Sequence, residues 1–484
     1  MSKFPDRFVE RIHDILPKDE WDNFFASATE PLPKTIRIAS KSGLKSAIEN
    51  WQLKIPPSWH LSPTNIPEAF FIQRDDQKEF PLGKTLEHFS GGIYIASLSS
   101  LLSVHVLDPK PNEKILDVAA APGSKSTFIA DRMKNTGVLV VNEPSSSRSM
   151  KLASNLDRMG VENEVLLQSD GTYLNTFFVQ EFDRILLDAP CSSEGFGRKD
   201  STFFEKMWSE KKIFEAAKLQ KKLIKASFEM LSPGGTMVYS TCTSAPEENE
   251  AVVQYLINTF GDHVEILPID LGMIPHHTGI TKFGTDTFDS EIVKNVRRIF
   301  PHLRSDTWNS EIFFIAKIKK TAPLSLGAKK PAPLKSSTQI LGKNQSATVI
   351  AKLCKNFGFG RKLFEKKVIL ERNDTLFLTT KTAAQFAVHH PYRRAGLPMI
   401  DKHENIMSPF AIHYGSLATT NRIELTTEEK ERWLEGFDIA LSKPLEKPDG
   451  TEIFVQYKEF CLGHGKVLNK GKKLKNKLDR SLVF

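Results

Sequence analysis

The chain has 484 residues, of which 40% are apolar and 26% are charged, and its formal net charge is +8. This length exceeds what one hydrophobic core can serve and predicts several domains of ordinary globular composition. The four cysteines contain no Cys-x-x-Cys pair, which argues against a disulfide framework or a zinc site, and no uncharged apolar run is long enough to span a bilayer.

The positive charge favours a polyanionic partner. The amino terminus, residues 1–7, carries charges where a signal peptide needs an apolar stretch. We therefore expect a monomeric cytoplasmic protein in a reducing compartment, with no membrane and no metal ion among its partners.

The first 85 residues begin with a helical pattern over residues 8–16 and predict a small α+β domain. Residues 86–320 predict a second domain, in which strands and helices alternate. We expect strands at 113–118, 137–142, 165–167, 185–187, 237–239 and 312–318, and helices after residue 124 and at 147–159, 211–231 and 246–260. This alternation predicts a mainly parallel, doubly wound, Rossmann-like α/β sheet with helices on both faces.

Proline, lysine and serine dominate residues 321–338, which predicts a linker. Beyond it we expect a mixed α/β region, divided into an intermediate domain at 339–410 and a last domain at 411–484. The end of the chain is strongly basic, and apolar residues alternate with its lysines, which favours a packed basic surface over a solvated tail. These basic residues are Lys466, Lys470, Lys472, Lys473, Lys475, Lys477 and Arg480.

A loop of small residues follows the strand at 113–118 and opens a helix, a place where backbone amides meet a ligand. The loop consists of Ala119, Ala120, Ala121, Pro122, Gly123, Ser124 and Lys125. A P-loop needs glycines where this chain has Ala119 and Ser124, and the dinucleotide fingerprint needs three glycines where Gly123 stands alone. Neither nucleotide motif is present, which also argues against a Rossmann oxidoreductase.

Two acidic residues follow the next two strands. Glu143 is placed to accept hydrogen bonds from two ribose hydroxyls, and Asp170 to accept one from an adenine amino group. Together they describe an adenosine pocket without a pyrophosphate cradle. Such a pocket suits S-adenosylmethionine better than NAD or ATP.

Two cysteines end strand-like runs, Cys191 after Asp188-Ala189-Pro190 and Cys242 after Ser240-Thr241. A buried, inert role is the more common one for a free cysteine. The Asp-Ala-Pro sequence and the upstream loop reverse that preference, because strand ends of an open α/β sheet build its active site and a thiolate is a strong nucleophile.

These motifs, in this order, resemble the Sun/Fmu family of RNA (cytosine-5) methyltransferases. The resemblance is carried by Ala-Ala-Pro-Gly-x-Lys, Asn-Glu, Ser-Asp, Asp-Ala-Pro-Cys-Ser and Ser-Thr-Cys-Thr, and by the segments at 85–88, 92–95 and 298–302. Residues 462–467 and 474–476 resemble the tail of the bacterial F-type small-subunit rRNA enzymes, which ends in a PUA-like RNA-binding module. The chain departs from the family at Ser124, Ala119 and Ala96, where glycine, cysteine and glutamine are usual.

The resemblance implies S-adenosylmethionine as cofactor and 16S rRNA, or the small ribosomal subunit, as partner. The loop from Ala119 to Lys125, together with Glu143, Asp170 and Asp188, would contact the methyl donor or the reacting base. Cys242 would be the nucleophile that adds to C6 of the cytosine, and Cys191 would assist release of the product. Residues 1–85 and 411–484 would bind RNA.

Two alternatives remain open at this stage. The catalytic motifs do not distinguish rRNA from tRNA as the substrate. A non-catalytic assembly factor would keep the fold and the RNA surface, although the intact set of Asp188, Cys191, Cys242 and Glu143 argues against a decayed site.

Overall fold

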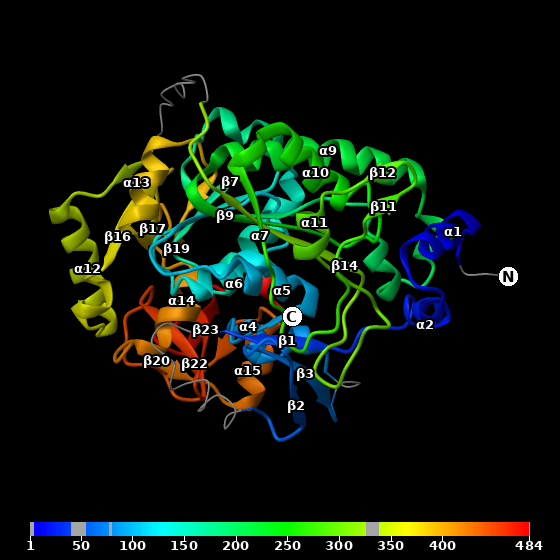
Figure 1. The fold of residues 1–484 in the computed structure, drawn as a ribbon. Helices are drawn as coiled ribbons and strands as arrows, with labels where there is room; N and C mark the ends of the chain where they lie inside the picture. Colours follow the sequence, from blue (N-terminus) through cyan, green and yellow to red (C-terminus); the bar gives the residue numbers. More distant parts are fainter. Residues whose placement is uncertain (1–3, 40–54, 77–79, 326–337, 484) are drawn as a thin grey trace.

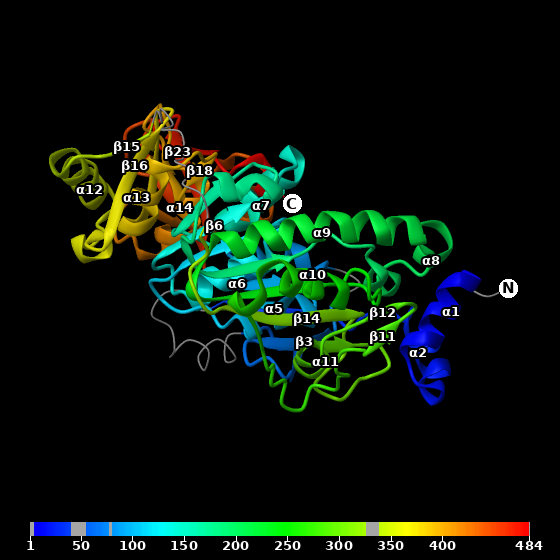
Figure 2. The same cartoon turned by 45° about the horizontal axis from the view of Figure 1, so that its top comes forward.

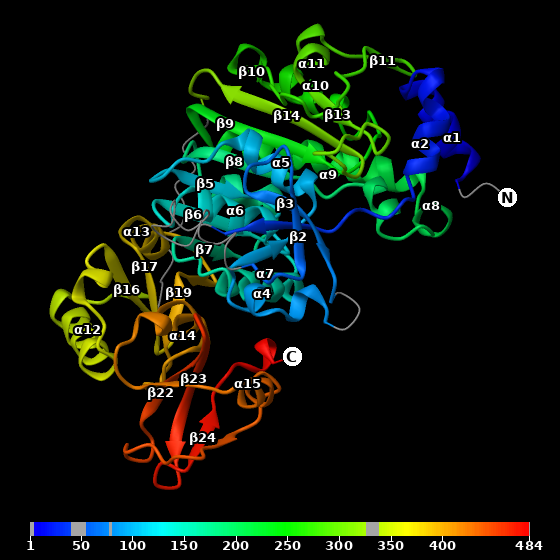
Figure 3. The same cartoon turned by 90° about the horizontal axis from the view of Figure 1, so that it is seen from below.

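The computed structural model describes residues 4–39, 55–76, 80–325 and 338–483, and Figure 1 shows their arrangement. A central sheet with helices on both faces forms the body of the molecule. The C-terminal part extends from this body on the side away from the N-terminal helices (Figure 3). Within these residues, no helix is both long enough and apolar enough to cross a membrane.

The N-terminal part consists of two helices and a small sheet. Helices α1 (Asp6–Ile15) and α2 (Trp21–Ser27) pack through Phe8 and Phe24 near Phe204, beside the short helix α8 at one end of the molecule (Figure 2). The sheet is antiparallel in the order β2-β3-β1-β4. Its strands are β1 (Thr35–Ile38), β2 (Trp59–Pro63), β3 (Ala69–Arg74) and β4 (Ile93–Ile95). This small sheet therefore takes its last strand from beyond residue 85.

The central sheet has the strand order β10-β14-β9-β8-β5-β6-β7-β18, and β13 also pairs with β14. The five central strands, β9-β8-β5-β6-β7, pair in parallel with one another. The strands outside these five, among them β10, β14 and β18, pair antiparallel with their neighbours. The strands are β5 (Lys114–Asp117), β6 (Val138–Asn142), β7 (Glu164–Leu167), β8 (Phe182–Asp188), β9 (Leu231–Thr241), β10 (Val264–Leu267), β13 (Arg297–Ile299), β14 (Phe313–Lys320) and β18 (Arg394–Ala395). The predicted mainly parallel, doubly wound sheet is confirmed.

Helices cover both faces of this sheet, as Figure 1 shows for α9 and α10 on one side and α5 and α6 on the other. Neighbouring residues of β5 point to opposite faces, so Ile115 and Leu116 enter different apolar cores. All five residues of β6 are buried, which is typical of a strand covered on both sides. The helices are α5 (Leu98–Leu107), α6 (Ser124–Arg132), α7 (Ser146–Arg158), α9 (Glu210–Met230), α10 (Glu250–Phe260) and α13 (Lys381–His389).

Two elements differ from the prediction. Helix α10 begins at Glu250 and not at residue 246, because residues 246–249 form turns whose side chains bond to other elements. Strand β9 begins at Leu231 and not at residue 237, so Pro233 lies inside it, whereas helix α9 ends at Met230, within one residue of the prediction. Short connecting elements are α4 (Leu86–Phe89), α8 (Phe203–Lys206), α11 (Ser290–Asn295), β11 (Lys282–Phe283) and β12 (Asp286–Thr287).

The C-terminal part contains two further sheets, in the orders β15-β16-β17-β19 and β20-β22-β23-β24-β21. Their strands are β15 (Gln339–Ile340), β16 (Lys367–Arg372), β17 (Thr375–Thr380), β19 (Leu397–Ile400), β20 (Arg422–Glu424), β21 (Ile439–Ala440), β22 (Glu452–Tyr457), β23 (Phe460–Leu468) and β24 (Lys473–Asn476). Helices α12 (Lys343–Phe357), α14 (Ser408–Tyr414) and α15 (Thr427–Leu434) accompany them. Leu378 of the first sheet, Phe410 of α14 and Phe454 of the second sheet share one core. Most of the predicted linker, residues 326–337, lies outside the described residues.

Strand β18 joins the C-terminal part to the edge of the central sheet by pairing with β7. Arg394 donates to both carboxylate oxygens of Asp157, at 2.6 and 2.8 Å, and to Glu164 at 2.8 Å. Helix α13 adds Ala383 and Phe386 to the core of the central part. No pattern in the sequence predicts this attachment.

We predict that Arg394→Met destabilises the protein, because Glu164 and Asp157 lose the cation that faces them inside the structure. Removing one partner of a buried ion pair costs about 3–5 kcal/mol. Compared with the unsubstituted protein, the variant should show a lower melting temperature and faster amide hydrogen exchange in β18 and β7. Arg393→Met is the matched control, because Arg393 is exposed and bonds to Gln168 at the surface. Equal melting temperatures for the two variants would contradict the assignment.

Candidate active site

Five polar side chains meet at one edge of the central sheet, because parallel strands present their carboxyl ends together. Asp117 ends β5 and Asp188 ends β8, whereas Glu143 and Asp170 follow β6 and β7. Cys242 follows β9 directly. The predicted site residues therefore lie along a common edge.

The loop after β5 has the shape that a close ligand requires. Gly123 stands at the start of α6 with φ +111°, a conformation that residues with a side chain rarely adopt. A Cβ there would also lie 3.1 Å from Leu152 Cδ1 of α7. Glycine at this position therefore lets the loop enter helix α6 while packing closely against α7.

A cavity of about 240 Å³ lies over this loop. Its lining comes from the loop, from the ends of β5 and β8, from residues 94–100 of β4, α5 and the segment between them, and from Lys199. These residues are Tyr94, Ile95, Ala96, Ser97, Ser100, Asp117, Ala119, Ala120, Ala121, Pro122, Ser124, Lys125, Asp188 and Lys199. Among the predicted residues, Gly123, Glu143, Asp170 and the two cysteines lie outside this lining.

Lys125 is buried in an ion pair at the floor of the site. Its Nζ lies 2.8 Å from Asp188 Oδ2 and donates to Ser100 Oγ at 3.3 Å, while Ser240 donates to Asp188 Oδ1 at 2.8 Å. Burial alone would lower the pKa of Lys125, but the charges of Asp188 and Asp117 and the nearby Cys242 raise it above its ordinary value. Lys125 is therefore a fixed positive charge inside the site, not a surface lysine.

Asp117 is the most deeply buried acid of the cavity, with 1% of its surface exposed. Burial raises its pKa to about 6, although Ser126 donates to Oδ2 at 2.7 Å and Lys125 opposes the shift. Its other oxygen, Oδ1, accepts no hydrogen bond within the described part of the chain. A buried acceptor without a partner, at the wall of a cavity, is suited to a ligand donor.

The two cysteines are in contact. Their Sγ atoms lie 3.0 Å apart, and the backbone N–H of Cys242 donates to Cys191 Sγ at 3.4 Å. The hydrogen bond with Cys242 and burial raise the pKa of the Cys191 thiol well above its usual range. Both side chains are half-buried. The structure therefore brings together the two sulfurs that the sequence singles out.

Glu143 and Asp170 are held by their own loops. Glu143 is 1% exposed, accepts from the Ser145 backbone at 3.0 Å and lies 3.5 Å from Arg148. Asp170 accepts from the backbone and hydroxyl of Thr172, at 2.9 and 2.8 Å. Both carboxylates keep a defined orientation at the edge of the sheet, on the side of the loop away from the cysteines.

Sequence reasoning missed several residues of the site. Tyr94, Ser97 and Ser100 reach the cavity from outside the alternating strand pattern. Tyr94 lies in the segment 92–95 that carries part of the resemblance, although its place in the cavity was not predicted, and no local signal marks Ser97 and Ser100. Glu248 and Asn249 lie beside the cysteine loops, and the acidic run Glu247-Glu248-Asn249-Glu250, which leads into α10, is the signal that points to them.

One group in the described ranges has the composition of a metal site, namely Glu20, His277 and His302. His277 Nε2 and His302 Nε2 lie 3.0 and 2.7 Å from the same oxygen, Glu20 Oε2. These distances are those of hydrogen bonds. The group joins the N-terminal helices to the central part.

Three family models match the chain. The model described as 16S rRNA methyltransferase RsmB/F matches residues 104–319. The N-terminal domain of 16S rRNA methyltransferase RsmF matches residues 4–96, and the methyltransferase RsmF PUA domain matches residues 420–484.

Relatives of similar length match almost the entire chain. Ribosomal RNA small subunit methyltransferase F of Escherichia fergusonii is 35% identical over 493 residues, covering 99% of this chain and 96% of that protein. The protein of the same name from Vibrio campbellii is 34% identical over 488 residues, covering 99% and 97%.

Solved structures share the fold. A methyltransferase homolog protein from Pyrococcus horikoshii is 32% identical, with a TM-score of 0.56, over 66% of this chain and 95% of that one. NSun6 from the same organism, solved with SFG, has a TM-score of 0.54 at 24% identity, over 66% and 99% of the two chains.

We predict that Lys125→Met destabilises the protein more at pH 8 than at pH 5. Asp117 and Asp188 then face each other without a cation, at a cost of about 3–5 kcal/mol when both are charged. At pH 5 the loss is smaller, because Asp117, with a pKa of about 6, takes up a proton. Melting temperatures at the two pH values measure the difference. Lys125→Arg keeps the charge and serves as the control, and equal losses at both pH values would contradict the account.

Proposed function

Because the chain belongs to the ribosomal RNA small subunit methyltransferase F family, we propose that it transfers a methyl group from S-adenosylmethionine to C5 of a cytidine in 16S rRNA. The observation that carries the proposal is the contact of Cys191 with Cys242 beside the Lys125–Asp188 pair. A nucleophilic sulfur, a second thiol, a carboxylate and a buried cation at one strand edge are the groups that this reaction needs.

The residues around the cavity fit an adenosine-containing methyl donor. Ala119, Ala120 and Ala121 leave space for close approach, and Oδ1 of Asp117 offers a buried acceptor. We assign Glu143 to the ribose hydroxyls, because its carboxylate is oriented by Ser145 at the end of the neighbouring strand. When bound, S-adenosylmethionine supplies an electrophilic methyl group.

Cytosine C5 is not nucleophilic enough to attack such a methyl group directly. Addition of the Cys242 thiolate to C6 would turn the ring into an enamine, whose C5 could then accept the methyl group as the bond from that group to the sulfonium sulfur breaks. Asp188 hydrogen-bonds the N3/N4 edge and favours a proton there as negative charge develops in the ring. Lys125 holds this carboxylate in place and provides a positive charge near Cys242.

Cys191 serves the second half of the reaction. After methyl transfer, a base must remove the C5 proton so that the bond from Cys242 to C6 breaks. Cys191, or a water that it positions, is placed for this step because its sulfur touches that of Cys242.

We predict that Cys191→Ala accumulates a covalent RNA–protein adduct on denaturing gels, because addition proceeds and elimination does not. Cys242→Ala gives neither adduct nor methyl transfer, and the double variant gives no adduct. The same gels, with methyl transfer followed from labelled S-adenosylmethionine, measure all three variants. Adduct formation in Cys242→Ala would reverse the two cysteine roles and leave the reaction class intact.

A cytidine in folded rRNA must leave its stack before it can enter the site, which costs a few kcal/mol. We propose that the N-terminal and C-terminal parts offset this cost by holding the phosphate backbone. In the C-terminal part, Val467 and Leu474 are fully buried while Lys470, Lys472 and Lys475 remain exposed. This arrangement supports a packed basic surface at the end of the chain.

We predict that replacing Lys470, Lys472 and Lys475 together by glutamine weakens rRNA binding and flattens its salt dependence. Each lost phosphate contact removes roughly 0.7 from the slope of log K against log salt, so the slope falls by about 2. Point variants are preferable to truncation, because α13 and β18 belong to the central core. S-adenosylmethionine affinity should not change.

The control carries glutamine at Lys110, Lys282 and Lys294, three exposed lysines of the central part. An unchanged slope in the C-terminal variant, or an equal decrease in the control, would remove the assigned role of this surface.

A further inference from the structure

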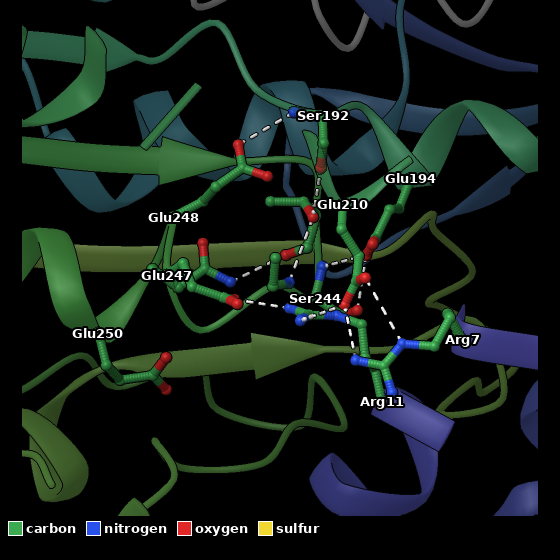
Figure 4. Close-up of polar contacts among 12 residues, drawn as sticks. Arg7, Arg11, Ser192, Glu194, Glu210, Ser244, Glu247, Glu248 and Glu250 are labelled. Atoms are coloured by element: carbon green, nitrogen blue, oxygen red, sulfur yellow. Dashed lines mark hydrogen bonds and ion pairs between the residues drawn. The ribbon is translucent and has the colours of Figure 1, made fainter. Parts of the chain in front are cut away.

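Four consecutive residues, from Glu247 to Glu250 at the start of α10, direct their side chains to four different elements. Figure 4 shows two of them, with Glu247 directed toward Arg11 and Glu248 toward Ser192. Glu247 bonds Arg11 of α1 at 2.6 Å, and Glu250 bonds Arg298 of β13. Between them, Glu248 reaches the loop of Cys191 and Asn249 reaches the loop of Cys242. Because these side chains bond outward, residues 246–249 form turns and not the first turn of a helix.

Glu248 holds the residues on both sides of Cys191. Its Oε2 accepts from the backbone N–H of Ser192 at 3.0 Å and from Gln220 Nε2 at 2.7 Å. The same Gln220 nitrogen donates to the carbonyl of Pro190 at 2.9 Å. One carboxylate therefore fixes the backbone before and after Cys191, directly on one side and through Gln220 on the other.

Asn249 does the same for Cys242. Its Oδ1 accepts from the hydroxyl of Thr241 at 2.6 Å, and its Nδ2 donates to the carbonyl of Thr243 at 3.0 Å. The residues before and after Cys242 are thus bonded to a single side chain.

Both side chains are fully buried, with 0% of their surface exposed. Buried polar groups of this kind hold a unique geometry, because breaking their bonds leaves unpaired groups away from water. Glu248 and Asn249 are also neighbours in the chain, so their Cα atoms are about 3.8 Å apart. This covalent spacing sets the distance between the two loops that they hold.

We propose that Glu248 and Asn249 are positioning residues, which respectively place Cys191 and Cys242 so that the two sulfurs act on the same base. The inference rests on the cysteine roles proposed above. It predicts that adjacent substitutions have opposite effects on the covalent adduct, an outcome that general loss of structure does not produce.

The first test compares Glu248→Ala and Asn249→Ala by adduct level and methyl transfer at saturating RNA. A misplacement of about 1 Å at a reacting group costs on the order of 100-fold in rate. Asn249→Ala should lose adduct and methyl transfer together on that order. Glu248→Ala should lose methylated product while adduct accumulates, as in Cys191→Ala. Glu248→Gln keeps an acceptor for Ser192 and should restore turnover.

Asn163→Ala and Glu164→Ala are the matched controls. They form a second adjacent Asn–Glu pair, both 0% exposed, at the amino end of β7 and therefore at the opposite edge of the sheet. They should lower stability without changing the ratio of adduct to product. If Glu248→Ala behaved as Glu164→Ala does, with an unchanged ratio, the positioning role would be overturned.

A second measurement does not depend on the proposed reaction. Diamide oxidises two adjacent thiols to a disulfide, taking two electrons and two protons onto its N=N bond. Peptide mapping should show the Cys191–Cys242 disulfide forming quickly in the parent and in both controls, and at least tenfold more slowly in Glu248→Ala and Asn249→Ala. The two tests can disagree. If Glu248→Ala and Asn249→Ala oxidised slowly but Cys191→Ala formed no covalent adduct, the result would count against the proposed function and not against the positioning role. Equal oxidation rates in all variants would overturn the positioning role itself.

Discussion

The parallel pairing of β8 with β9 determines whether the two cysteines can meet. Asp188 pairs with Ser240 in this register, and the backbone of Ala189 donates to the Ser240 carbonyl at 2.9 Å. A slip of one residue would move one loop by about 3.3 Å, more than the 3.0 Å that separates the sulfurs. It would also break the bond from the Ser240 hydroxyl to Asp188. The carboxylate that we assign to the base and the sulfur pair therefore depend on a single register.

The parallel arrangement of the strands is what the sequence predicts best. Alternation of buried strands and helices predicts the parallel sheet, and parallel strands place Glu143, Asp170, Asp188 and the cysteines at one edge without any knowledge of side-chain contacts. The burial of Lys125 was not predictable, because it depends on Ser100, which reaches the site from a separate element. Likewise, β18 has two residues and no periodicity. Its pairing with β7 is accompanied by an ion pair between Arg394 and Glu164, which are more than 200 residues apart in the sequence.

The turn before α10 links the N-terminal helices, for which we propose RNA binding, to the loops of the two cysteines. Glu247 bonds the buried Arg11 of the first helix, and its neighbour Glu248 bonds the loop of Cys191. The N-terminal helices therefore cannot shift without disturbing the segment that holds the cysteines. An RNA held by these helices is kept at a constant distance from the site, which is the condition for moving one base into reach of Cys242.

Long-range attraction for RNA and local chemistry place opposite demands on charge. We propose that the net charge of +8 and the exposed lysines at the end of the chain serve association, whereas the strand edge itself is acidic, with Asp117, Asp188 and Glu143 at the ends of neighbouring strands. A thiolate is disfavoured beside such acids. Lys125 resolves the conflict, because it faces Asp188 and Asp117 from inside the cavity and adds a positive charge near Cys242. In the proposed scheme, cations on different elements supply binding and reactivity, so each set can be changed without the other.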